Sequence, residues 1–406
     1  MGVVIRMRFR RATWGLVLGL LACEAAPAPW ATPAEATPTV AAEAPLVEQT
    51  SVLDHGRLVK QARGLLDDQP SGCARKVRRK GRAARKKGRA RPCVENPVVA
   101  VVDPRSEHIE LVRAGKDISV GKQVVIQQAV ANGVNTEYAP VYPSGAAVLA
   151  VKRTVPVKDR GWREVIYTPY SPTLNTPEIR ARGLEYLQGV VARAQQKLRA
   201  RKVPSQAFRG RLAADVVPAE LAVALAINEH LDPHRFTRGE TVRDLMDEVL
   251  VVLGTNERSA YNYAVSADGA RGLWQFMAGT YHSLRRQYPG ARLRQDFELG
   301  ADDHVNAAMA CLLLFDADLA VLPTRERARL RQDPEEMGRF LAATYNGGAG
   351  LVEAAYDGVN PLWTTALEAE ETRTYVDKYA AIRRLLVERG PQMQSAVTSV
   401  GQPSKG

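Results

Sequence analysis

Apolar residues recur with helical spacing through the second half of the chain, from Pro218 to Val387. The segment that begins at Asp302 is apolar around most of its circumference, which predicts a buried central helix. The expected helices cover residues 220–230, 241–258, 302–319, 337–344 and 372–387. The pattern therefore predicts a helical domain over residues 206–392, followed by a flexible tail over 393–406.

A different pattern precedes this domain. Short runs of β-branched residues alternate with turn residues, as in the strands of a small sheet. These runs cover residues 98–102, 109–112, 124–126, 148–151 and 165–167. Thr176 and Pro177 are residue types of a helix N-cap and first helical position, and a helix to about Lys202 is expected to link the two parts. Residues 97–205 are thus expected to form an accessory β-rich or mixed region plus this helix.

The first 22 residues have the order of a secretion signal: arginines, an apolar run too short to cross a bilayer, and small residues. Cys23 follows Leu20-Leu21-Ala22, an order that resembles the processing box of a bacterial lipoprotein. We expect an exported protein of the bacterial cell envelope or periplasm, anchored to the outer membrane by lipid on Cys23. Ordinary signal cleavage near Ala25 or Ala26 is the alternative.

Composition changes the picture only between the signal and the first strand. Residues 23–96 are poor in large apolar side chains, which predicts a flexible tether. The net charge is +12, but eleven Lys and Arg lie within residues 75–91, so the rest of the chain is near neutral. We expect residues 74–92 to be a disordered basic segment that contacts anionic envelope polymers or stays solvated. Nucleic acid is not expected as a partner, because no aromatic residues interleave the charges. Cys73 and Cys93 flank the segment, and whether they pair stays open.

A single carboxylate, Glu257, stands near the end of the expected helix 241–258, and the glycine-rich turn Gly269-Ala270-Arg271-Gly272 follows it. Burial on the lip of an apolar helix would raise the pKa of this carboxyl, so that it keeps a proton near neutral pH. The glycines would let the backbone approach a ligand closely. This arrangement favours Glu257 as a general acid.

Three motifs follow one another along the chain. They are Glu257 with Ala264-Val265-Ser266 and Gly269-Ala270-Arg271-Gly272-Leu273-Trp274-Gln275, then Ala343-Thr344-Tyr345-Asn346-Gly347-Gly348-Ala349-Gly350, then Glu371-Thr372 with Tyr375-Val376. Together they resemble the signature of soluble-type lytic transglycosylases, relatives of goose-type lysozyme, and three motifs in order are more specific than one. The resemblance covers residues 218–386. It implies a mainly α fold, with a lysozyme-like helical catalytic domain preceded by the small β-rich region and the basic N-terminal segment.

The resemblance implies a peptidoglycan lytic transglycosylase. Such an enzyme cleaves the bond between N-acetylmuramic acid and N-acetylglucosamine and leaves 1,6-anhydromuramoyl ends. Glu257 matches the acid/base, Gln275 a glutamine that hydrogen-bonds the sugar, and Trp274 an apolar wall for the ring face. Tyr345 and Asn346 match residues that orient the acid and hold the N-acetyl group. The expected substrate-binding residues are Ser259, Trp274, Gln275, Tyr345, Asn346 and Tyr375.

Some residues depart from the family pattern. Arg258 stands where the family has a serine directly after the acid, and it is expected to point to solvent. An inward-pointing Arg258 would lower the pKa of Glu257 and work against its role as a proton donor. The chain would then be a catalytically weak peptidoglycan-binding or scaffold protein. A basic adhesin acting through residues 74–92 and a hydrolytic muramidase are further alternatives. Asp268 is the only second acid near the expected acid loop and is interpreted as a turn residue, which favours ring closure over hydrolysis.

Glu229 is the rival acid. Asp232-Pro233 follows it as in the acid segment of the family, but no glycine-rich turn follows at the family's distance, so Glu257 is preferred. Glu229, His230 and His234 also imitate a zinc-binding helix, yet the Glu precedes the first His and Pro233 interrupts the helix. No metal or cofactor is therefore expected.

Overall fold

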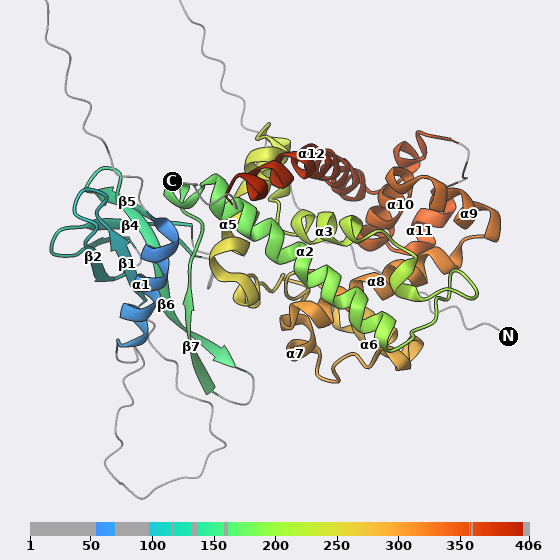
Figure 1. Ribbon diagram of the computed structural model, residues 1–406, viewed down its shortest axis with the longest axis horizontal. Helices are drawn as coiled ribbons and strands as arrows, with labels where there is room; N and C mark the ends of the chain where they lie inside the picture. The colour runs from blue at the N-terminus through green and yellow to red at the C-terminus, as the bar shows by residue number, and fades with distance from the viewer. Residues whose placement is uncertain are drawn as a thin grey trace, which may run out of the picture. The chain divides into compact units, whose positions relative to one another are not determined.

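A computed structural model of the chain describes residues 54–69, 97–115, 117–130, 136–157, 161–356, 358 and 360–400 (Figure 1). It is 57% helical and 15% strand, with a small sheet region before the helices. The coarse fold class expected from the sequence is thereby confirmed. The expected signal, Cys23 and the segment 74–92 with its flanking cysteines lie outside the described residues.

Among the described residues, the sheet region contains seven strands in two antiparallel sheets. The four-stranded sheet has the order β2-β1-β6-β7 and the three-stranded sheet the order β3-β4-β5. The strands are β1 (Val98–Val102), β2 (Ile109–Arg113), β3 (Ile118–Val120), β4 (Val125–Val130), β5 (Glu137–Tyr142), β6 (Ala147–Val157) and β7 (Gly161–Tyr167). Each β-branched run singled out in the sequence coincides with one of these strands, except that Val124 lies just before β4. Their side chains fill cores between the two sheets and between the sheet and the helices.

One helix lies before the sheet region and was not predicted. α1 (His55–Asp67) lies within the segment expected to be a tether and packs against β1 and β6. Asp54 caps it by accepting a hydrogen bond from the Arg57 amide at 2.9 Å. Its buried face joins the core of the sheet region through Leu58, Val59, Ala62 and Leu66. The apolar stripe has the helical spacing of an amphipathic helix, which the composition of the surrounding segment obscured.

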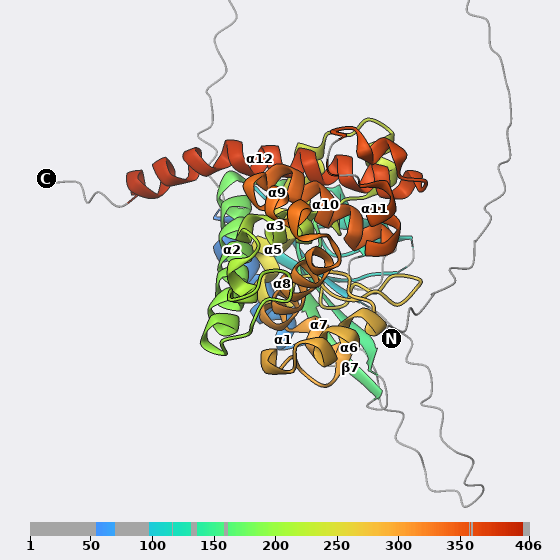
Figure 2. The same ribbon diagram turned by 90° about the vertical axis from the view of Figure 1, so that its right-hand side faces the viewer.

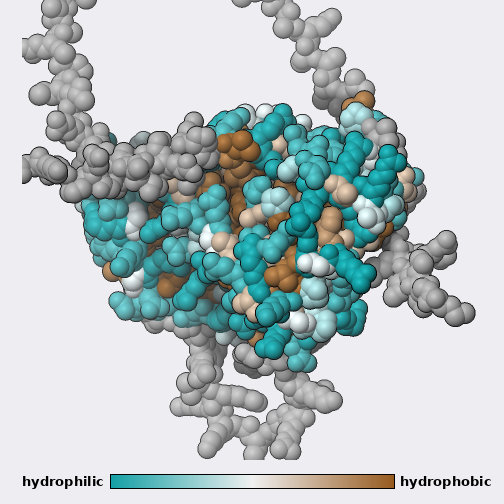
Figure 3. Space-filling view, turned by 45° about the vertical axis from the view of Figure 1, so that its right-hand side comes forward, coloured by the Kyte–Doolittle hydropathy of each residue, from teal (hydrophilic) through white to brown (hydrophobic). Residues whose placement is uncertain are grey.

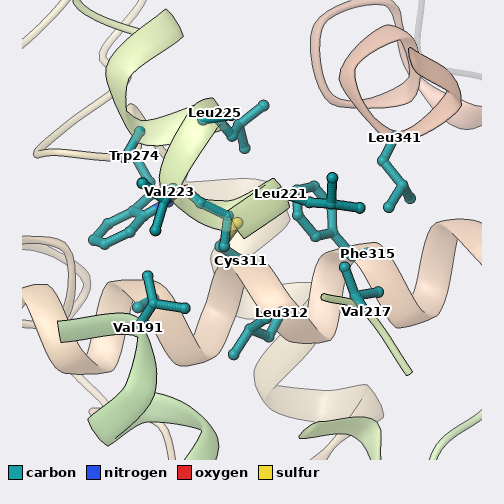
Figure 4. Packing of buried hydrophobic residues seen from close by; sticks show 14 of the residues in the cluster. Val191, Val217, Leu221, Val223, Leu225, Trp274, Cys311, Leu312, Phe315 and Leu341 are labelled. Carbon is teal, nitrogen blue, oxygen red and sulfur yellow. Dashed lines mark hydrogen bonds between the residues drawn. The ribbon is translucent and has the colours of Figure 1, made fainter. Parts of the chain in front are cut away.

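The helical part surrounds α8 (His304–Val321), as the apolar circumference of this segment predicted. Cys311 and Phe315 of α8 pack with Leu221, Leu341 and their neighbours in one large core (Figure 4). Among the described residues, α8 alone is long and apolar enough to cross a membrane, and 72% of it is buried inside the protein. On the face in Figure 3 most of the described surface is hydrophilic, with apolar residues showing between the polar ones. These observations are typical of a core helix.

The other helices on predicted segments are α2 (Pro177–Ala200), α3 (Ala219–Asn228), α5 (Val242–Asn256), α10 (Pro334–Gly347) and α12 (Glu370–Val400). Further helices that were not predicted are α4 (Pro233–Thr237), α6 (Ala278–Gln287), α7 (Phe297–Asp302), α9 (Thr324–Gln332) and α11 (Ala349–Ala355). α12 packs on α3 and α10 (Figure 2) and continues past residue 392, where the sequence suggested a tail. Thr176 caps α2 and Pro177 is its first residue, as predicted.

The sheet region and the helices share a joint at the end of α5. Asn256 is buried, and its side chain accepts a hydrogen bond from the Thr168 amide at 2.8 Å and donates one to the Thr168 carbonyl at 2.7 Å. α5 also lies very close to α2: a Cβ on Gly254 would stand 2.2 Å from the carbonyl oxygen of Ile179. Only glycine permits this approach, and it positions the joint beside the first turn of α2.

Candidate active site

A cleft of about 820 Å³ lies between the sheet region and the helices. Its walls come from the sheet region and the segment after it, from α5, and from the loop between residues 261 and 275. The carboxylates that line it are Glu137, Glu229, Asp232 and Glu248, with Arg235 as a cation and Gln275 as an amide. These groups suit the binding of a polar ligand. What the cleft can catalyse depends on which of them are not held by other contacts.

Glu229 is a partly buried acid in the wall of this cleft. It follows α3 directly, and all residues of α3 from Leu221 to Asn228 are buried, so the helix carries the carboxyl into the protein. The hydroxyl of Tyr375 donates a hydrogen bond to Glu229 Oε1. Burial raises the pKa of Glu229 to about 7, against the opposing effects of this hydrogen bond and of the Lys378 charge. The carboxyl can therefore hold a proton near neutral pH and release it there.

Lys378 provides a buried cation beside this acid. It lies on α12, is 4% exposed, and its ammonium donates to the Leu231 carbonyl at 3.0 Å and to the Asn228 carbonyl at 3.4 Å. Its Nζ also lies 5.7 Å from the centre of the Tyr375 ring. Burial lowers the pKa of Lys378, and the charge of Glu229 opposes that effect. The two groups thus stabilise each other's charged forms.

The glycine-rich turn delivers Gln275 to the same cleft. Arg271 forms isolated bridges with Val265 and with Phe276, which fold the segment back on itself. Gly272 has φ +80°, and a Cβ there would stand 2.5 Å from the Ala301 carbonyl oxygen, so the turn needs glycine. The amide of Gln275 donates to the Gly272 carbonyl at 2.8 Å, which fixes its orientation in the cleft wall.

The second and third motifs meet this turn. The hydroxyl of Tyr345, in the last turn of α10, donates to the Trp274 carbonyl. Burial raises the pKa of Tyr345 well above its usual value, and the neighbouring Glu229 charge adds to the effect. Asn346 accepts a hydrogen bond from the Thr372 hydroxyl at 2.8 Å, which ties the end of α10 to the start of α12. The glycine-rich part of the first motif and the other two motifs therefore meet around Glu229.

Glu257 lies elsewhere, and the expectation that it is buried is wrong. Its side chain is 53% exposed, it does not line the cleft, and its ion-pair partner is Arg182 of α2 at 3.7 Å. α5 turns its apolar face into the core and ends just before Glu257, which follows in a 3₁₀ turn with φ +45° that points outward. Arg258 is exposed, as expected. Ser259 lies in the same short turn and does not line the cleft.

Two further predicted site residues have different surroundings from those expected. Trp274 has no exposed surface, so the prediction of a sugar-binding wall is wrong; its indole N–H donates to the Ala222 carbonyl of α3 at 3.2 Å. Tyr375 is 7% exposed and contacts the acid. Asp268 is exposed at the tip of the turn, and the hydroxyl of Ser266 caps that turn by accepting from the Ala270 amide at 3.0 Å.

Sequence reasoning ranked Glu229 second and missed His230. The segment from Pro233 to Ser259 explains this ranking. It makes Glu229 distant from the glycine-rich turn along the chain, although the two lie at the same cleft in space. The His230 ring stacks on Tyr261, the first residue to line the cleft after this segment. The sequence signal for Glu229 was Asp232-Pro233 after it, as in the acid segment of the family.

Within the described part of the chain, no group of three or more His, Cys, Asp and Glu is placed to hold a metal ion. Comparison of the chain with protein-family models, with curated proteins and with solved structures found no match.

Proposed function

We propose that the chain is a peptidoglycan lytic transglycosylase with a lysozyme-like helical domain, and that Glu229 is its acid/base. The observation that carries this proposal is the convergence of the glycine-rich turn and of the second and third motifs on one partly buried carboxyl. Tyr375 of the third motif bonds Glu229 directly, Tyr345 of the second bonds the Trp274 carbonyl of the first, and Gln275 lines the same cleft. The motifs support the substrate class, and the pKa of about 7 supports the role.

In the proposed reaction, protonated Glu229 donates its proton to the oxygen that bridges N-acetylmuramic acid and N-acetylglucosamine. The resulting carboxylate then accepts the proton of the muramic acid C6 hydroxyl, whose oxygen attacks the anomeric carbon. One C–O bond breaks and one forms within the sugar, and no water is added. A pKa near neutrality suits both steps, since the same group must be an acid first and a base afterwards. Gln275 would hydrogen-bond the sugar that lies in the cleft.

Two of the other cleft carboxylates have structural partners. Asp232 caps α4 by accepting from the His234 amide at 2.8 Å. Glu248 accepts from two guanidinium nitrogens of Arg235, at 2.6 and 2.7 Å. These groups are held in place by other contacts, which favours a reaction that does not need a second catalytic carboxylate.

Hydrolysis remains the second candidate because of Glu137. This residue lies on β5 and lines the cleft, and burial raises the pKa of its carboxyl, with the charge of Glu248 adding to the effect. A hydrolytic muramidase would need such a group to activate water or act as nucleophile.

The test is to digest purified peptidoglycan sacculi with the full chain and weigh the soluble fragments by mass spectrometry. We expect fragments with anhydromuramoyl ends, one water lighter than the fragments of a lysozyme. Glu137→Gln should release the same fragments at a similar rate. Water-added fragments that disappear in Glu137→Gln would replace the proposal with hydrolysis, and release of no fragments by the parent chain would remove both.

A further inference from the structure

His230 follows the acid directly and lines the cleft beside it. Two contacts fix its ring. The ring stacks on Tyr261 with centroids 3.6 Å apart and planes inclined by 14°. Its Nε2 lies 3.0 Å from the carbonyl oxygen of Leu273, in the glycine-rich motif. The imidazole therefore has a single orientation relative to the cleft.

These contacts also determine which ring nitrogen holds the proton. A carbonyl oxygen only accepts hydrogen bonds, so Nε2 of His230 must be the N–H donor to Leu273. Burial lowers the pKa of His230 to about 3, with the charges of His304 and Lys378 acting in the same direction and the Leu273 hydrogen bond opposing. The ring is neutral at working pH, and Nδ1 keeps its lone pair.

Nδ1 is thus an acceptor without a proton. In the described part of the chain, no hydrogen bond reaches Nδ1. The atom is also not enclosed by the protein, so a ligand in the cleft can reach it. A ring nitrogen with such a low proton affinity is a poor base at neutral pH, so it is suited to accepting a hydrogen bond and not to removing a proton.

We propose that Nδ1 of His230 accepts a hydrogen bond from a donor on the bound sugar, either an acetamido N–H or a hydroxyl, next to the bond that Glu229 cleaves. This inference rests on the proposed function. It makes His230 a substrate-contacting residue at the position where the family has a serine.

A matched pair of variants separates this role from a structural one. In His230→Gln the amide nitrogen can replace Nε2 and keep the bond to Leu273, but the acceptor at Nδ1 is lost. In His230→Asn the amide oxygen can replace Nδ1, but the bond to Leu273 is lost. We expect roughly a tenfold loss of kcat/KM on peptidoglycan fragments for His230→Gln, as for one neutral hydrogen bond, and a smaller loss for His230→Asn. The reverse order, or equal losses, would show that His230 only holds Leu273 in place.

Thermal unfolding of both variants shows whether they are folded at the assay temperature. If either is not, ¹⁵N NMR of labelled histidine in the Glu229→Gln chain decides instead. At saturating β-1,4-linked N-acetylglucosamine oligomer, the Nδ1 signal of His230 should shift toward the value of an accepted hydrogen bond. A shift with this oligomer but not with a β-1,4-linked glucose oligomer identifies the acetamido N–H as donor, and a shift with both identifies a hydroxyl. An unchanged signal in the presence of bound oligomer overturns the proposal.

Failure of this inference is distinguishable from failure of the proposed function. If Glu229→Gln is inactive while the order of the two His230 variants is reversed, only the inference about His230 fails. If Glu229→Gln cleaves as fast as the parent chain, the proposed function fails first.

Discussion

The ends of α3 and α5 differ in the surroundings of the glutamate that follows each helix, and these surroundings decide which acid can act. Both helices are apolar and both are followed directly by a glutamate. Glu229 lies in a cleft, bonded by a buried tyrosine and with a raised pKa. Glu257 is 53% exposed beside Arg182. The difference teaches that an apolar helix before an acid does not bury that acid; the segments that pack over the helix end do.

The largest expected effect separates the two acids by activity. Glu229→Gln keeps the shape of the side chain and its acceptor oxygen but removes the proton, so release of soluble fragments from sacculi should fall by about two to four powers of ten. Glu257→Gln is the matched control and should retain the parent rate, because its carboxyl is exposed and outside the cleft. The opposite pattern would return the catalytic role to Glu257.

The end of α5 should matter for stability instead. Asn256→Ala leaves the buried N–H and C=O of Thr168 without their partners. Each of these two unsatisfied groups costs about 1–3 kcal/mol, so the free energy of unfolding should fall by about 2–6 kcal/mol in urea denaturation. Glu257→Gln, one residue further along, should change it by less than about 0.5 kcal/mol. Similar effects of the two substitutions would mean that the joint between the sheet region and α5 is weaker than its contacts indicate.

The smallest effect concerns pH. Activity requires the protonated form of Glu229, so it should be present at acidic pH and decline as pH rises through about 7. The positive charge of Lys378 and the hydrogen bond from Tyr375 both lower this pKa. Lys378→Met removes the charge and should move the alkaline limb of the kcat/KM profile to higher pH, whereas Lys378→Arg should leave it nearly in place. An unmoved limb in Lys378→Met would assign Lys378 only to holding the end of α3.

Much of the helical fold could be predicted from periodicity. The apolar circumference of α8 identified the central helix, and the β-branched runs located strands of both sheets. α1 was missed because its short apolar stripe is embedded in a segment whose composition is that of a linker. Periodicity reports which face is buried, whereas composition averages over both faces.

The site was harder to predict, because a motif spacing is a distance along the chain and catalysis needs a distance in space. The spacing from Glu257 to the glycine-rich turn fits the family pattern, yet the fold turns this residue away from the cleft. Trp274 was misassigned for a related reason: the sequence places it next to Gln275, and neighbouring side chains in a tight turn point to opposite sides. Gln275 lines the cleft, while Trp274 is enclosed in the core.

The stacked rings of His230 and Tyr261 have a topological consequence. The chain runs from one ring through α4 and α5 to the other, so the segment between them is an excursion along the chain whose two ends touch in space. Within it, α5 packs in the helical core and lines the cleft. The entropy cost of closing a loop grows only slowly with its length, so the exposed turn between α4 and α5 can be longer or shorter at little cost, provided that α5 keeps its place. The same excursion carries Asn256, which fastens the sheet region. α5 therefore serves both parts of the protein: it lines the cleft that holds the acid, and its last residue ties the sheet region to the helices.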